Sequence, residues 1–92
     1  MIEVEYEAYG NRYKGRITGI RARRLLLGGY CLEVKLQLAG SNAFTTLYIS
    51  PYKIDIVNAK EVRSTSGKLR FDDENWEKFR KEVFRILDTV EI

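Results

Sequence analysis

Residues 72–87, DDENWEKFRKEVFRIL, predict an amphipathic helix, and its apolar stripe constrains the fold more than any other feature of the chain. Apolar residues recur there at steps of three and four, the spacing of one helix face. Asp72 is placed to accept hydrogen bonds from backbone N–H groups two and three residues on, so we expect it to be the N-cap. Because such a stripe must be buried, the preceding residues must supply an apolar surface. The stripe consists of Trp76, Phe79, Val83, Ile86 or Leu87, and Val90.

The first twenty residues predict a β-hairpin. Apolar residues alternate with glutamates from Ile2 to Ala8, the period of a half-buried strand. Gly10-Asn11 suits a two-residue loop with glycine first, as a type II′ turn requires. This register sets acidic residues of the first strand opposite basic residues of the second, so we expect the latter to be neutralised. The predicted opposed pairs are Tyr9 with Arg12, Glu7 with Lys14, Glu5 with Arg16, Ala8 with Tyr13, Tyr6 with Gly15 and Val4 with Ile17.

A second hairpin is predicted over residues 31–50, with residues 39–42 as its loop. Closing the loop at Leu38 and Ala43 sets apolar residues of the two strands against each other on the core side: Leu36 with Thr45, Val34 with Leu47 and Leu32 with Ile49. The other face combines a base, an amide, hydroxyls and two aromatic rings. That composition fits single-stranded nucleic acid, where bases stack on rings and cations follow phosphates. It also fits a dimer interface or a face covered by the C-terminal helix. The face carries Lys35, Gln37, Phe44, Thr46 and Tyr48.

The remaining segments complete a single domain over residues 1–92. Tyr52–Val62 is expected to be a strand, and residues 63–67 a polar loop. Residues 68–71 predict a short strand with Leu69 and Phe71 inward. We therefore expect an α+β, mostly β fold: a strongly bent antiparallel sheet or small open barrel of about six strands over residues 1–71. One C-terminal amphipathic helix follows over residues 72–88.

The positive charge is concentrated in the middle of the chain. The net charge is +3, yet residues 11–70 hold twelve Lys and Arg against three acidic residues. This asymmetry indicates a polyanionic partner. Arg21, Arg23 and Arg24 have no acidic residue within eight positions, which makes them the strongest candidates for phosphate contacts. Residues 25–27, three leucines before a Gly-Gly turn, are expected either to complete a strand or to cap one end of the core.

Several kinds of chemistry lack the residues they need. The chain has no histidine and one cysteine, Cys31, so neither a zinc cluster nor an imidazole base is available. We expect a protein that is not an enzyme and needs no metal or cofactor, with no small-molecule substrate. The N-terminus shows no signal peptide and no segment could span a bilayer, so we expect a cytoplasmic protein without a membrane partner. The abundance of Arg and Glu would also suit a thermophile.

The junction Leu69-Arg70-Phe71-Asp72-Asp73-Glu74-Asn75-Trp76, preceded by a basic Ser/Gly loop, resembles the PC4-like family. These are single-strand DNA-binding transcriptional coactivators, related in architecture to the Whirly and Pur domains. Glu74 and Trp76 would match the family's acidic residue and tryptophan. The resemblance implies a dimer paired through its helices and a curved sheet that grips single strands, with Lys68 and Arg70 near the nucleic-acid backbone.

These observations together predict a small, non-enzymatic module that binds nucleic acid, with single-stranded DNA or RNA favoured. The alternative is a protein-interaction or structural subunit, such as a homo-oligomer or a component of a virus or larger complex. In that alternative the Phe44/Tyr48 face and the helix flank would be assembly surfaces. The predicted phosphate contacts are Arg21, Arg23, Arg24, Lys35, Lys68 and Arg70, and the predicted stacking residues are Phe44 and Tyr48.

Overall fold

The computed structural model describes residues 1–50, 60–64 and 66–89. Its regular elements are six strands and one helix. They are β1 (Ile2–Ala8), β2 (Asn11–Arg24), β3 (Tyr30–Leu38), β4 (Phe44–Ile49), β5 (Glu61–Arg63), β6 (Lys68–Arg70) and α1 (Asp73–Thr89).

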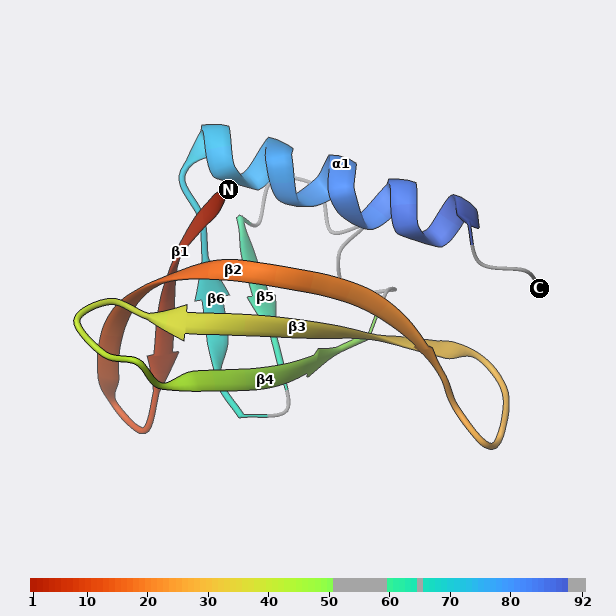
Figure 1. The fold of residues 1–92 in the computed structure, drawn as a ribbon, viewed down its shortest axis with the longest axis horizontal. Coiled ribbons are helices and arrows are strands. Elements are labelled where there is room, and N and C mark those ends of the chain that lie inside the picture. The colour runs from red at the N-terminus through yellow and green to blue at the C-terminus, as the bar shows by residue number, and fades with distance from the viewer. Residues whose placement is uncertain (51–59, 65, 90–92) are drawn as a thin grey trace.

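The six described strands form one antiparallel sheet in the order β4-β3-β2-β1-β6-β5. The sheet curls into a half-barrel, and α1 lies across one side of it (Figure 1). Among the described strands, β4 and β5 are the two edges. The predicted class, a bent antiparallel sheet of about six strands with one C-terminal helix, is confirmed.

Helix α1 begins where the sequence predicts. The Asp72 side chain accepts a hydrogen bond from the backbone N–H of Asn75 at 2.8 Å, which caps the first turn. The Asn75 side chain then accepts one from the backbone N–H of Glu3 at 2.9 Å, which ties the helix start to β1. The predicted stripe is buried against the sheet at Trp76, Phe79, Val83 and Ile86; Val90 lies outside the described residues.

The β3–β4 hairpin has the predicted register. Leu32 pairs with Ile49, Val34 with Leu47 and Leu36 with Thr45. All of these except Thr45 are almost fully buried. Side chains alternate between the two faces of a strand, and these residues lie on the face that packs against the helix. Leu69 and Phe71 also point into this core, as expected. Most of the predicted strand Tyr52–Val62 lies outside the described residues, and its end falls within β5.

The predicted turn between β1 and β2 is wrong by one residue. The loop is Tyr9-Gly10, and both residues have positive φ, 53° and 78°, the combination that a type I′ turn needs. Glu7 therefore faces Arg12 and Glu5 faces Lys14, a shift of two residues from the predicted pairs. Because side chains alternate with a period of two, this shift leaves every residue on its predicted face.

A β-bulge divides β2 into two parts. The register against β3 shifts between Ile17 and Gly19, so Thr18 is an extra residue. One extra residue moves every later side chain of the strand to the other face. The arginines after the bulge consequently share a face with the basic residues before it, while the apolar residues after it pack on the core. The core side receives Ile20 and Ala22, and the other side receives Arg21 and Arg23.

The three leucines after β2 neither complete a strand nor cap the core, so both expectations for them are wrong. They lie in the loop that joins β2 to β3, and all three side chains are exposed. This loop projects at one end of the sheet (Figure 1).

Candidate nucleic-acid interface

The side of the sheet that faces away from α1 is strongly charged, and we call it the outer face. Strand alternation places nine basic and five acidic described residues on it, a positive excess of four. A net positive face attracts polyanions, but its local pairing decides which cations are available. The basic residues are Arg12, Lys14, Arg16, Arg21, Arg23, Lys35, Arg63, Lys68 and Arg70; the acidic ones are Glu3, Glu5, Glu7, Glu33 and Glu61.

An open groove of about 740 Å³ lies along the middle of the sheet. Its walls come from β1, β2 and the end of β3, together with the 39–41 loop and the 70–72 segment that leads into α1. Two of its basic residues, Lys14 and Arg16, come from the part of β2 before the bulge. The lining also contains Arg70 and three acidic residues, Glu3, Glu5 and Asp72, so its formal charges balance. The groove therefore provides a concave site in which Lys14 and Arg16 lie beside carboxylates.

Lys14 and Arg16 are not neutralised in the way that the sequence predicts. Arg12 does pair with Glu5 and Glu7, at 3.7 Å in each case. Within the described residues, however, neither Lys14 nor Arg16 has a carboxylate within 4.0 Å. The guanidinium of Arg16 instead donates two hydrogen bonds to the neutral amide oxygen of Gln37. Neither charge is therefore neutralised by a direct ion pair, although Glu5 and Glu3 lie opposite Lys14 and Arg16 in register.

The aromatic residues continue this surface on β4. Phe44 is 61% exposed and Tyr48 37% exposed. Register places Phe44 beside Gln37, which itself is beside Arg16, so a cation, an amide and a ring form one row across three strands. The next row has Lys35 between Gly19 and Thr46, and Lys35 forms no ion pair with any described residue. The alternative in which α1 covers this face is excluded, because α1 packs on the opposite side.

Arg21 and Arg23 are less available than their sequence neighbourhood indicates. Both form ion pairs with Glu33 of the adjacent strand, at 3.2 and 3.3 Å. Glu33 is only 5% exposed, and the hydrogen bond from Arg21 is the main cause that lowers the pKa of its carboxyl below the ordinary 4.5. The two arginines share one carboxylate and keep one net positive charge. Arg24 pairs with Tyr30 in register and, by alternation, points to the other side of β2.

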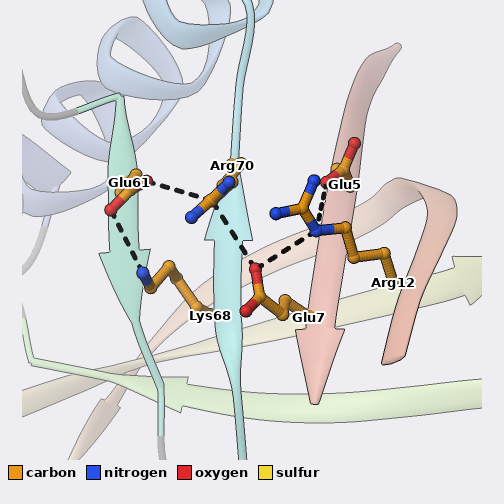
Figure 2. A network of polar contacts seen from close by, with 6 residues as sticks. All are labelled: Glu5, Glu7, Arg12, Glu61, Lys68 and Arg70. Atoms are coloured by element: carbon orange, nitrogen blue, oxygen red, sulfur yellow. Dashed lines mark ion pairs between the residues drawn. The ribbon is translucent and has the colours of Figure 1, made fainter. Parts of the chain in front are cut away.

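Lys68 and Arg70 belong to an ion-pair network rather than to an open cationic surface. Arg70 pairs with Glu61 at 3.0 Å and with Glu7 at 3.7 Å, and Lys68 pairs with Glu61 at 3.3 Å (Figure 2). Glu7 extends the network to Arg12 of β2. The network connects β5, β6, β1 and β2, so the positive charges of Lys68 and Arg70 lie beside carboxylates.

The described residues offer no arrangement for metal chemistry. Within residues 1–50, 60–64 and 66–89, no group of three or more Cys, Asp or Glu side chains is placed to hold a metal ion. In the same ranges, no helix has both the length and the apolar character that crossing a bilayer requires.

The structure thus brings together three of the predicted site residues, Lys35, Phe44 and Tyr48. It adds Lys14 and Arg16, which sequence reasoning discounted because glutamates were expected to neutralise them. Side-chain pairing across a strand depends on reach and rotamer, which alternation alone does not specify. Comparisons with protein-family models, curated proteins and solved structures found no match.

Proposed function

We propose that this protein binds single-stranded nucleic acid on the β2–β3–β4 part of its outer face. The observation that carries the proposal is the row in which Arg16, Gln37 and Phe44 lie side by side. Lys14 and Lys35 flank this row with further positive charge. Cations provide salt-dependent attraction to phosphates, and exposed rings provide stacking for unpaired bases.

The exposed rings favour a single strand over a duplex. Bases in a duplex are already stacked on each other, so they cannot lie on Phe44 or Tyr48 without being unstacked. The two residues are four positions apart on one strand, roughly 13 Å at the usual rise per residue. Beside Lys35, Gly19 carries no side chain, and a Cβ added there would meet no atom within 4 Å. A flexible strand can follow such a surface.

The test is fluorescence anisotropy of a labelled mixed-sequence single strand, titrated with protein at about 50 and 200 mM salt. Three phosphate contacts, from Lys14, Arg16 and Lys35, give a logarithmic salt slope of about −2 for single strands. We therefore expect affinity to fall roughly fifteenfold between the two salt concentrations. A duplex of the same sequence should bind more weakly. Absence of binding at the lower salt concentration would refute the proposal.

Matched variants identify the surface. Lys35→Gln removes one charge from the outer face, and Lys81→Gln removes one charge from the exposed side of α1. The first should weaken binding and reduce the salt slope by about 0.7, whereas the second should change neither. Phe44→Ala should weaken binding about tenfold, the loss expected for one stacked base. Equal effects of Lys35→Gln and Lys81→Gln would show that attraction is non-specific.

The alternative function, a protein-interaction or structural subunit, uses the same exposed rings. In that case Phe44 and Tyr48 would be buried against another protein or a second copy of the chain. Such a contact would be insensitive to salt over this range, since apolar burial involves no counterion release. Sedimentation of the protein alone at both salt concentrations distinguishes the two functions.

A further inference from the structure

The loop between β2 and β3 presents aliphatic side chains to solvent. Leu26 and Leu27 have relative exposures of 105% and 102%, and Leu25 is also exposed. β4 ends opposite Leu32, so the last residues of β2 and the first of β3 extend beyond it. The loop therefore stands clear of the sheet (Figure 1). A contiguous exposed apolar group of this kind marks an interaction site.

The leucines are held in this position by the turn itself. Gly28 donates its N–H to the carbonyl of Leu25 at 3.1 Å, and Leu25 donates to the carbonyl of Gly29 at 3.0 Å. Gly28 and Gly29 both have positive φ, 98° and 79°, which glycine adopts without steric cost. Leu26 and Leu27 are thus fixed at the outermost point of the turn. Their burial against a partner would require little further ordering of the backbone.

The base of the loop is positively charged. No acidic residue occurs between Ala8 and Leu32, and Arg24 immediately precedes the leucines. Arg24 forms no ion pair with any described residue. Arg21 and Arg23 share the single carboxylate of Glu33 and add one net charge. The leucines form an apolar tip, and the arginines at the base of the loop are cationic. This arrangement is complementary to a lipid bilayer, in which anionic headgroups lie over a hydrocarbon interior.

We propose that the Leu25–Leu27 loop inserts into the surface of an anionic lipid bilayer, with Arg24 among the headgroups. The sequence-based expectation of no membrane partner rested on the absence of a spanning segment, which an inserting loop does not need. A nucleic acid also carries anionic groups, but the tip has neither rings for stacking nor amides for base edges. The inference does not depend on the proposed nucleic-acid function, because Arg24 and Leu25–Leu27 lie outside the row formed by Arg16, Gln37 and Phe44.

The test is co-sedimentation with vesicles of phosphatidylcholine that contain either no anionic lipid or roughly one-third phosphatidylglycerol. The wild-type protein should bind the anionic vesicles and not the neutral ones. Leu26→Ser with Leu27→Ser should weaken binding at least about tenfold, because it removes the apolar groups that insert. Arg24→Gln should weaken it about fivefold, the contribution of one cation near an anionic surface.

Tyr9→Asn is the matched control. Tyr9 is 92% exposed at the β1–β2 turn, the opposite end of β2, and asparagine tolerates its positive φ. This variant should bind vesicles as the wild type does. The proposal is overturned if the wild type ignores anionic vesicles, or if the double leucine variant binds them normally. It is also overturned if the leucine variant loses only oligonucleotide binding, which would assign the loop to nucleic acid.

Discussion

Arg16 donates two hydrogen bonds to the side-chain oxygen of Gln37, from Nε at 3.2 Å and from Nη2 at 3.1 Å. A neutral acceptor orients the guanidinium without cancelling its charge. Seven residues further along β2, Arg23 has a carboxylate partner instead, Glu33, whose negative charge it shares with Arg21. The chemical identity of the partner on β3 therefore decides which arginine of β2 can attract an anion.

Gln37→Glu should convert Arg16 from an available cation into a member of an ion pair. The variant replaces the amide nitrogen of Gln37 by an oxygen, and this side chain already contacts the Arg16 guanidinium. We therefore expect the fold to be unchanged. Oligonucleotide affinity at low salt should fall about tenfold, and the salt slope should become shallower by about 0.7 for the lost contact. Anisotropy titrations at several salt concentrations measure both quantities.

Thr89→Glu is the control for Gln37→Glu. It adds one negative charge at the last residue of α1, whereas the groove lies near the residues that precede that helix. The 17 residues of α1 separate the two sites by roughly 25 Å. Affinity should therefore stay close to that of the wild type. If both variants weaken binding equally, the protein's overall charge, and not Arg16, determines affinity.

Glu33→Gln tests whether Arg21 and Arg23 can contact a ligand when they are released. Removing the shared carboxylate raises the net charge of the outer face by one and frees both guanidinium groups. If these arginines approach phosphates, as the sequence predicts, affinity should rise several-fold and the salt slope should steepen. Glu82→Gln is the control, since it breaks a comparable ion pair on α1. Unchanged affinity of Glu33→Gln would remove Arg21 and Arg23 from the interface.

The same variant should alter the acid stability of the protein. The pKa of Glu33 is lower in the folded protein than its ordinary 4.5, chiefly through the hydrogen bond from Arg21. The ionised carboxyl therefore stabilises the fold above about pH 4.5, and this contribution is lost as the pH falls through the folded-state pKa. Glu33→Gln should be less stable than the wild type at pH 7, and the difference should shrink towards pH 3. Urea unfolding followed by circular dichroism at each pH measures it.

The sequence predicted features that depend on local periodicity. Local spacing predicts the apolar stripe of the helix and its Asp72 cap. The spacing of apolar residues within one hairpin predicts the β3–β4 register. The position of the bulge at Thr18 was not predicted, because nothing in the local pattern separates a bulge from a continuous strand. Without that bulge, Arg21 and Arg23 would lie on the core side. Their pairing with Glu33 therefore could not be anticipated.

The exposed leucines show a different limit of sequence reasoning. Three consecutive apolar residues usually indicate burial, so Leu25–Leu27 was expected to belong to the core or to a strand. The Gly28-Gly29 pair places them in a turn instead, where all three side chains are exposed. A leucine that contacts a partner and a leucine that packs in the core are the same residue type, so the sequence alone does not distinguish them.

Asp72 should contribute to stability mainly as a helix cap. The pKa of its carboxyl lies below the ordinary 3.8, first because the backbone N–H of Asn75 donates to it and then because the Asn75 side chain does. Its stabilising effect is therefore complete above about pH 3.8 and is lost as the pH falls through the folded-state pKa. Asp72→Ala should lower the melting temperature by about 4–8 °C at pH 7, the usual shift when a domain of this size loses one cap. Asp72→Asn should retain most of the cap but lose this pH dependence.

Gly67→Ala should destabilise the protein and Gly19→Ala should not, although both glycines lie in or beside strands. A Cβ on Gly67 would come within 2.5 Å of the carbonyl oxygen of Glu7 and 2.6 Å of the Tyr6 ring. The backbone at Gly67 would have to move away from β1, so we expect a loss of about 1–3 kcal/mol in the free energy of unfolding. A Cβ on Gly19 meets no atom within 4 Å, and its φ is not positive.

Gly19→Ala should therefore be neutral or stabilise the protein by up to about 1 kcal/mol, because alanine reduces the entropy of the unfolded chain. Urea unfolding of the two variants beside the wild type measures the free energies. Gly19 also lies next to Lys35 in register. The same variant therefore adds a methyl group to the surface proposed to bind nucleic acid. A methyl group there should leave phosphate attraction intact, and the salt slope should equal that of the wild type. Equal destabilisation by both substitutions would contradict the close approach of Gly67 to β1.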